Sequence, residues 1–238
     1  MAAFNNDPSS LEEAFDRANS AEVPLSEKLA AYTGSHRRLS PQVAAAYDSL
    51  VARLVEAKAG RTGPKVGELM PAFALPDECG HLTSLPQLLA GGPAVVSFNR
   101  GHWCGFCRLE LRAMADVESQ LAALGARIVS IVPTRAPFAR QLKQDSALPF
   151  TILTDSDCGY AMSLGLTVSV GRELLELYEK RGIRLGEFQD NGGWLLPIPA
   201  TFVVARNGTI LARFIDPDFR KRMDIEEIVA AVRMQAAA

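Results

Sequence analysis

The hydrophobic positions change their spacing near residue 60 of the chain. Before that point apolar residues recur every three or four positions, which is typical of helices that bury one face. Ser10 and Glu13 have the spacing of a capping box for a first helix, and residues 26–37 predict a second. Ser40-Pro41 is a typical helix start. The third helix that it opens carries apolar residues at helical spacing: Val43, Ala46, Tyr47, Leu50, Val51, Leu54 and Val55.

After residue 64, short apolar runs alternate with helical stretches. Strands are expected at residues 71–75, 83–85, 94–98, 126–132 and 150–153. Helices are expected at residues 104–124, 137–144, 157–164 and 173–181, before an irregular stretch at 186–196. Residues 201–205 and 209–214 predict a hairpin with a type I′ turn at Asn207-Gly208, and Asp224 with Glu227 caps a last helix. This order predicts an α/β fold whose central mixed β-sheet is flanked by helices.

The segment from Gly60 to Pro64 is rich in turn-forming residues and reads as a linker. It divides the chain into a helical N-terminal extension, residues 1–63, and an α/β domain, residues 64–238. A unit of about 60 residues buries too little surface to be stable alone. We therefore expect the extension to pack on the main domain or on a second subunit, and the latter would make the protein a homodimer.

The composition excludes several classes of function. The formal net charge of the 238 residues is −2 and the pI is about 6.0, so nothing indicates a nucleic-acid partner. No run of about 20 apolar residues predicts a membrane span, and the N-terminus lacks the features of a secretory signal. We expect a cytoplasmic, reducing location, where four cysteines are too few for a disulfide scaffold.

The clearest chemical feature is a Cys-x-x-Cys pair, Cys104 and Cys107, in a predicted turn between a strand and a helix. A cysteine is nucleophilic as its thiolate, and a helix N-terminus stabilises that charge. One helical turn separates the two residues, so they are close enough to form a disulfide. Arg100, together with Arg108 and His102, adds positive potential, while Trp103 and Phe106 supply an apolar wall. The pair can cycle between dithiol and disulfide, or reduce a peroxide through a sulfenic acid.

This arrangement resembles the thioredoxin-like superfamily. Leu196-Pro-Ile-Pro-Ala-Thr-Phe-Val-Val204 looks like the strand that carries the superfamily's cis-proline, which Pro199 matches. The resemblance implies a thioredoxin-like fold in which that proline lies beside the dithiol. We expect Pro199, Arg100 and Trp103 to border the substrate.

From about Lys65 onward the chain more closely resembles the peroxiredoxin-like AhpC/TSA branch. The resemblance rests on Val66-Gly-Glu-Leu-Met-Pro-Ala-Phe-Ala-Leu75, the Cys-x-x-Cys helix with Glu110, Thr151-Ile-Leu-Thr-Asp155 and the Ala200-Thr-Phe-Val-Val204 strand. It implies a thiol peroxidase that acts on hydrogen peroxide or organic hydroperoxides and is regenerated by a thioredoxin- or glutathione-type reductant. It implies no cofactor and no metal.

Two departures from the family pattern stand out. In the pattern Pro-x-x-x-Thr/Ser-x-x-Cys, Cys107 matches the peroxidatic cysteine, but Cys104 stands at the Thr/Ser position and Arg100 at the Pro position. The family arginine that steadies the peroxide, normally just before the strand at 201, has no match in Pro197-Ile-Pro-Ala200. Thioredoxin logic makes Cys104 the attacking sulfur, which we favour for exchange with a protein partner. The peroxiredoxin register makes it Cys107, which we favour for reaction with a peroxide. Either way the product is a Cys104–Cys107 disulfide.

Two other functions fit the same dithiol. One is a reductase of protein disulfides with negligible peroxidase activity, which the missing arginine favours. The other is a redox sensor that oxidises without turning over and uses its helical extension as an interaction surface. A zinc site is a weaker interpretation, because no second pair of ligands accompanies Cys104 and Cys107.

The remaining chemistry-bearing residues have plain interpretations. Cys158 is expected to be a small buried filler and Cys79 an exposed turn residue. Arg135 and Trp194 lie where they could reach the site or simply face solvent or the core. The basic run Arg220-Lys221-Arg222 is interpreted as a solvated turn, and His36 and His81 give no signal.

Overall fold

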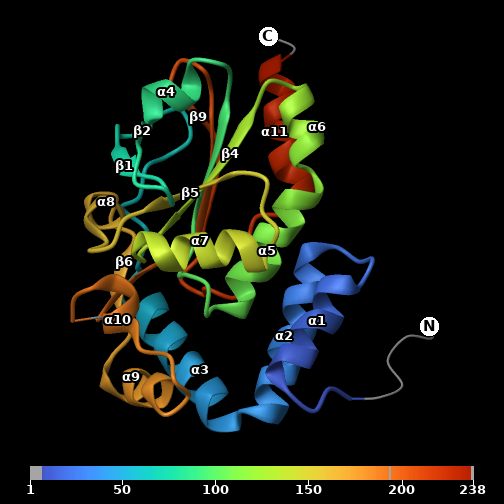
Figure 1. The fold of residues 1–238 in the computed structure, drawn as a ribbon, viewed down its shortest axis with the longest axis vertical. Coiled ribbons are helices and arrows are strands. Elements are labelled where there is room, and N and C mark those ends of the chain that lie inside the picture. Colours follow the sequence, from blue (N-terminus) through green and yellow to red (C-terminus); the bar gives the residue numbers. More distant parts are fainter. Residues whose placement is uncertain (1–6, 193, 237–238) are drawn as a thin grey trace.

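A five-stranded sheet forms the centre of the molecule (Figure 1). The structure, a computed structural model, describes residues 7–192 and 194–236. The strand order is β5-β4-β3-β8-β9, in which β3 pairs in parallel with β4, β4 in parallel with β5, and the remaining neighbours are antiparallel. The strands are β3 (Ala94–Phe98), β4 (Arg127–Val132), β5 (Thr151–Thr154), β8 (Ala200–Val204) and β9 (Ile210–Ile215). The predicted mixed α/β fold is confirmed.

Side chains along the central strands alternate between two apolar clusters, as the two-residue period of a strand requires. Val95 and Val203 face one cluster, while their neighbours Val96 and Phe202 face the other. The first cluster is covered by α5 (Gly105–Asp116), α6 (Glu118–Ala123), α7 (Ala136–Asp145) and α11 (Ile225–Ala236). The second is covered by the shorter helices α4 (Leu85–Leu89) and α8 (Gly159–Ser163). The sheet is therefore buried on both faces.

The N-terminal extension consists of α1 (Leu11–Ser20), α2 (Leu25–Leu39) and α3 (Pro41–Glu56). Drawn in blue in Figure 1, these helices lie beside α5 and below the sheet. Helices α1 and α2 pack on α5, and α3 packs on α9 (Arg172–Glu179). The extension thus buries its apolar face against its own chain. The expectation of a homodimer stays a prediction.

Five short elements complete the fold. β1 (Ala74–Pro76) pairs with β2 (Leu82–Ser84), β6 (Thr167–Ser169) pairs with β7 (Leu195–Pro197), and α10 (Leu185–Gln189) follows α9. The stretch at 186–196 is therefore less irregular than predicted, because elements of three to five residues are too short to show a period. The helix expected at 104–124 is interrupted at Val117, between α5 and α6.

Two local predictions are wrong. A type I′ turn requires positive φ at both central residues, yet in the hairpin Gly208 has a φ of 90° and Asn207 is not in the positive region. The Gly208 N–H instead closes the turn on the Ala205 carbonyl at 2.8 Å. The second correction concerns Pro199: the described residues contain no cis peptide bond, so the predicted cis-proline is trans, the isomer that most X–Pro bonds adopt.

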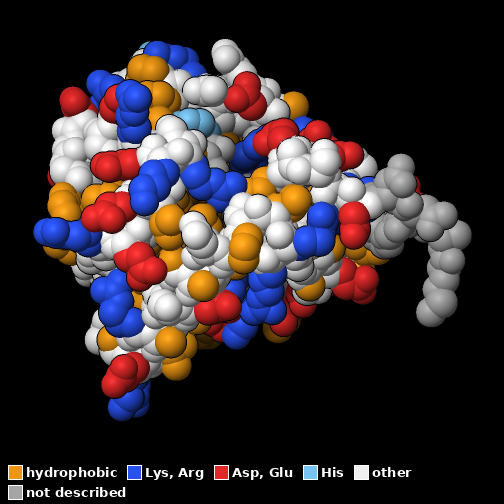
Figure 2. All heavy atoms as spheres, turned by 90° about the horizontal axis from the view of Figure 1, so that it is seen from below, with side chains coloured by type: hydrophobic (Ala, Val, Ile, Leu, Met, Phe, Trp, Pro, Cys, Tyr) orange, Lys and Arg blue, Asp and Glu red, His pale blue; other side chains and the backbone are white. Residues whose placement is uncertain are grey.

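The surface carries mixed charge. On the face shown in Figure 2, seen from below Figure 1, basic and acidic side chains are interleaved with apolar ones. Positive and negative potentials on that face therefore largely offset one another. None of the helices in residues 7–192 and 194–236 combines the length and the apolar character needed to cross a membrane.

Candidate active site

The dithiol lies where β3 ends and α5 begins. Asn99 anchors the end of β3 through side-chain hydrogen bonds to Ser97 at 2.8 Å and to Ser130 at 3.2 Å. Gly101 then takes a φ of 118°, and the Cys104 N–H donates to its carbonyl at 3.2 Å. A side chain at Gly101 would also press on Trp103. The turn therefore brings Cys104 to the N-cap of α5.

The two sulfurs are adjacent and almost completely enclosed. Cys104 Sγ and Cys107 Sγ are 2.7 Å apart, and both cysteines are free thiols. The exposed fraction is 3% for Cys104 and 0% for Cys107. Cys107 Sγ also accepts the Arg100 backbone N–H and an Arg222 guanidinium N–H, each at 3.4 Å. The Cys107 sulfur is therefore held by a backbone N–H group and by one guanidinium group.

Arg222 corrects the prediction of a solvated basic turn. Its side chain is 1% exposed, and its Nε donates to a Glu110 carboxylate oxygen at 2.6 Å. Glu110 is equally buried and also accepts the Thr201 hydroxyl at 3.1 Å. Arg222 further donates to the Phe219 carbonyl. A carboxylate on α5 thus draws one arginine of the basic run into the interior.

The charges around the sulfurs separate their acidities. Burial raises the pKa of Cys104, but the Cys107 hydrogen bond and the Arg100 and Arg222 guanidinium groups outweigh it and lower that pKa to about 6. Burial and the adjacent Cys104 thiolate raise the pKa of Cys107. The pair therefore carries one thiolate and one thiol near neutral pH, with the negative charge on Cys104.

Arg100 and Trp103, which were predicted to border the substrate, lie beside the dithiol, and their contact with substrate stays a prediction. The Arg100 guanidinium lies 3.9 Å from the centre of the Phe219 ring and 4.9 Å from that of Trp103. Its NH2 group donates to the Tyr178 hydroxyl at 2.8 Å. The cation is stacked between aromatic faces next to the dithiol, a favourable setting for a buried guanidinium.

The extension supplies much of the wall around the site. His36 stacks on Phe106 with ring centres 5.5 Å apart, and Tyr32 meets the edge of Phe106 at 4.9 Å. The Tyr32 hydroxyl lies against Gly105, where a side chain would collide with it. Burial lowers the pKa of His36 to about 4, so this ring packs as a neutral aromatic group. Sequence analysis gave no signal for it, because a helix pattern predicts a buried face but not its partner.

Other candidate residues lie at different distances from this chemistry. Pro199 is buried at the start of β8, two residues before Thr201. His102 stacks on Phe138 with ring centres 5.4 Å apart, and burial lowers its pKa. Arg135 donates to the Glu187 carbonyl at 2.9 Å, and Trp194 is 48% exposed. These observations place neither Arg135 nor Trp194 at the dithiol.

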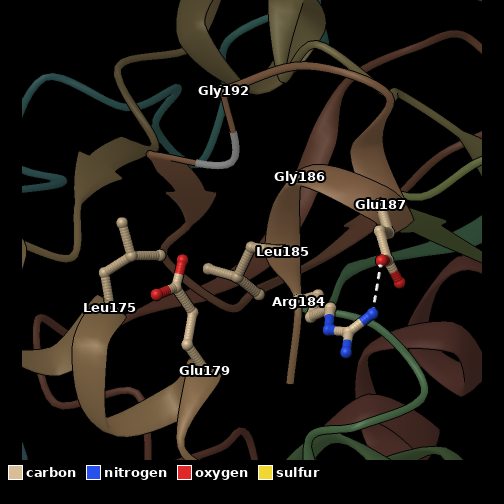
Figure 3. Close-up of a pocket in the computed structure, with 7 residues that line it drawn as sticks. All are labelled: Leu175, Glu179, Arg184, Leu185, Gly186, Glu187 and Gly192. Carbon is tan, nitrogen blue, oxygen red and sulfur yellow. Dashed lines mark hydrogen bonds and ion pairs between the residues drawn. The ribbon is translucent and has the colours of Figure 1, made fainter. Parts of the chain in front are cut away.

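The two remaining cysteines are as predicted: Cys79 is exposed and Cys158 is buried. Across the described ranges no three or more His, Cys, Asp and Glu side chains are arranged to hold a metal ion. A pocket of about 360 Å³ beside α9 and α10 is lined by Leu175, Glu179, Arg184, Leu185, Gly186, Glu187 and Gly192 (Figure 3). Its lining includes neither sulfur of the dithiol, so it is a separate feature.

Residues 66–213 match the family model described as the AhpC/TSA family. The chain belongs to the AhpC/TSA family. A Coxiella burnetii protein whose name places it among the peroxiredoxins, bcp, is 31% identical to this AhpC/TSA chain over 108 residues. Those residues are 45% of this chain and 71% of the bcp protein.

Solved structures agree on the fold of this AhpC/TSA protein. Peroxidoxin BcpB from Mycobacterium tuberculosis has a TM-score of 0.56 at 21% identity and covers 71% of this chain and 97% of its own. AhpC from Enterococcus faecalis has a TM-score of 0.54 at 15% identity, with 71% and 90% covered. The thioredoxin-like fold class is therefore confirmed.

Arg222 brings a guanidinium to the dithiol from a position that the family pattern did not predict. Sequence analysis found no arginine just before β8 to match the one that members of the AhpC/TSA family carry. In this structure a guanidinium reaches Cys107 from the segment that follows β9. A carboxylate buried at Glu110 needs a buried cation as its partner. The three basic residues in a row at 220–222 do not show which of them supplies it.

Proposed function

We propose that the chain is a thiol-dependent peroxidase whose reacting groups are Cys104 and Cys107. The observation that carries the proposal is the pair of sulfurs 2.7 Å apart beside the guanidinium groups of Arg100 and Arg222. Two nearby cations stabilise a thiolate, which is the form of cysteine that attacks peroxides. Membership of the AhpC/TSA family and the likeness to the Coxiella peroxiredoxin support the same activity.

In the proposed first step the Cys104 thiolate attacks one oxygen of a hydroperoxide. The new S–O bond forms as the O–O bond breaks, so Cys104 becomes a sulfenic acid and the other oxygen leaves as an alkoxide or hydroxide that takes up a proton. Arg222 and Arg100 stabilise the charge that develops on the leaving oxygen. Cys104 is chosen because its pKa is lowered while that of Cys107 is raised.

In the second step the Cys107 sulfur attacks the sulfenic sulfur, which forms the Cys104–Cys107 disulfide and releases water. The 2.7 Å between the sulfurs leaves little movement to be made. An external dithiol of the thioredoxin type, or two glutathione molecules, then reduces the disulfide and is itself oxidised. Hydrogen peroxide and small organic hydroperoxides are the proposed substrates.

Stopped-flow oxidation of the reduced protein tests this function. We expect hydrogen peroxide or cumene hydroperoxide to change the fluorescence of Trp103 much faster than either oxidises free cysteine, and mass spectrometry to find one Cys104–Cys107 disulfide. Dimedone trapping in Cys107→Ser should label Cys104 as the sulfenic acid. Labelling of Cys107 in Cys104→Ser alone would reverse the assigned order of attack. Oxidation no faster than that of free cysteine would reject the peroxidase and favour exchange with protein disulfides.

A further inference from the structure

Arg100 is a buried cation with an unusual set of partners. Its residue is 3% exposed, and in the part of the chain that the structure describes it forms no ion pair with a carboxylate. The buried carboxylate of Glu110 is engaged by Arg222. The Arg100 Nε has no hydrogen-bond partner among the described residues. Arg100 lies beside the dithiol, since its backbone N–H donates to Cys107 Sγ at 3.4 Å and its guanidinium lies 4.9 Å from the ring of Trp103, the residue before Cys104. The charge that offsets Arg100 is therefore the thiolate of the dithiol.

A guanidinium between aromatic faces can turn about its long side chain, so its place beside the thiolate depends on a directional contact. The hydrogen bond to Tyr178, 2.8 Å long, provides that contact. An arginine can only donate, so the Tyr178 oxygen accepts and its own O–H remains free to donate. Tyr178 in turn meets the edge of Tyr47, with ring centres 6.3 Å apart, and the two hydroxyls interact. All three side chains are buried.

The three side chains of this group come from separate parts of the fold. Arg100 follows β3, Tyr178 lies on α9, and Tyr47 lies on α3 of the N-terminal extension. Arg53 of α3 also donates to the Ser169 carbonyl at 2.9 Å, which ties the extension to the segment before α9. The extension thus reaches the dithiol through polar contacts as well as through apolar packing.

We propose that Tyr178 is a positioning residue for the peroxidase, which holds the Arg100 guanidinium against the dithiol, and that Tyr47 completes this support from the N-terminal extension. The proposal rests on the function proposed above, since it assigns Arg100 to the sulfurs that react. It makes helix α3 a working part of the active site.

The alternative is that Tyr178 only fills space. Tyr178→Phe separates the two roles, because the ring contacts with Trp103 at 5.0 Å and Tyr47 at 6.3 Å remain while the acceptor for Arg100 is lost. The charged and titratable groups that face the sulfurs are Arg100, Arg222, Glu110, Tyr32, Tyr47 and Tyr178. The substitution removes the Tyr178 hydroxyl alone, and with it the contact with Arg100 and the interaction with the Tyr47 hydroxyl.

The test is the pH dependence of iodoacetamide alkylation of the reduced full-length chain, followed at Cys104 by mass spectrometry. In Tyr178→Phe we expect the rate at pH 6 to fall about five- to tenfold, because a shift of about one unit in a thiol pKa changes the thiolate fraction about tenfold below that pKa. Tyr47→Phe, which removes the hydroxyl that interacts with Tyr178, should shift the profile in the same direction by less. Tyr160→Phe is the matched control, since its hydroxyl donates to the Pro71 carbonyl in another cluster.

An alkylation profile of Tyr178→Phe that coincides with those of the wild type and Tyr160→Phe would overturn the proposal. If Tyr178→Phe does not fold, the profile of Tyr47→Phe decides: a shift supports the proposal and coincidence with wild type overturns it. Peroxide oxidation is measured on the same samples. A wild type that fails to react with peroxide rejects the peroxidase, whereas the alkylation profiles still report whether Tyr178 controls the thiolate.

Discussion

Two helices of this protein begin with the same pair of residues, a cysteine followed by a glycine. Cys104 is the N-cap of α5 and is followed by Gly105, and Cys158 is the N-cap of α8 and is followed by Gly159. Both cysteines are buried, with exposed fractions of 3% and 1%. A reading based on helix N-termini alone would make both of them reactive.

Their surroundings have opposite charge. Cys104 faces Arg100 and Arg222 and accepts a hydrogen bond from Cys107, so its pKa is lowered to about 6. Cys158 is buried near Asp155 and Asp157, and both burial and these carboxylates raise its pKa. The comparison teaches that the side chains brought in by tertiary contacts, more than the helix end, decide which buried cysteine ionises.

The largest expected effect is on turnover. Cys104→Ser and Cys107→Ser should each lower peroxide consumption, measured with excess reductant, by about a thousandfold or more, because the attacking or resolving sulfur is gone. Cys158→Ser should keep nearly the full rate. A Cys158→Ser protein as inactive as the other two would break the comparison.

Removing Arg222, one of the two cations near Cys104, should strongly destabilise the fold. Arg222→Leu leaves Glu110 buried and unpaired, and we expect the free energy of unfolding to fall by about 3–5 kcal/mol. Urea denaturation measures this. The double substitution with Glu110→Leu should recover most of the loss. Arg184→Leu, which breaks the exposed 2.8 Å pair with Glu187, is the matched control and should change the free energy of unfolding little.

The pH dependence of labelling should separate the two cysteines. Because the pKa of Cys104 is lowered to about 6, its alkylation rate should rise through pH 6 and fall about tenfold for each unit below pH 5. Cys158 should label only after unfolding. The same shift affects stability, because an unfolded cysteine keeps its proton up to about pH 8.5 whereas folded Cys104 loses it near pH 6. Cys104 therefore makes the reduced protein more stable as the pH rises from 6 to 8.5. Cys104→Ser should lose that rise in denaturant titrations.

The smallest expected difference is in stability, between variants of the two glycines that follow the N-cap cysteines. A side chain at Gly105 would collide with the Tyr32 hydroxyl, so Gly105→Ala should destabilise the fold by about 1–3 kcal/mol and displace α2. A side chain at Gly159 meets only the Asp157 carboxylate, at 3.1 Å, at an exposed position. Gly159→Ala should therefore change the melting temperature little. Equal losses in the two variants would show that Tyr32 does not constrain the cap of α5.

The fold was largely predictable because its long elements have strong patterns. The apolar run of β3 and the capped helices of the extension could be recognised from their own residues. The elements that were missed, such as β6 and α10, are too short to show a period. The type I′ turn and the cis-proline were wrong because the sequence signals fit more than one backbone geometry.

The site was only half predictable. Adjacent residues supplied the Cys104–Cys107 pair, Arg100 and Trp103. Arg222 and the aromatic wall from α2 and α3 come from positions far away in the sequence, and a single sequence does not show which surfaces meet. Arg222 in particular was hidden inside a basic run whose other members, Arg220 and Lys221, pair with Asp218, Asp48 and Asp216 outside the dithiol.

The buried cations around the sulfurs also set the direction in which electrons move. Arg100 and Arg222 stabilise a thiolate, and a thiolate exists only in the reduced pair. Favouring the reduced pair raises the reduction potential of the Cys104–Cys107 couple, by about 30 mV for each tenfold preference. A couple of that kind readily takes electrons from a partner dithiol and is a weak reductant of stable disulfides. The O–O bond of a peroxide is a strong enough oxidant to accept those electrons.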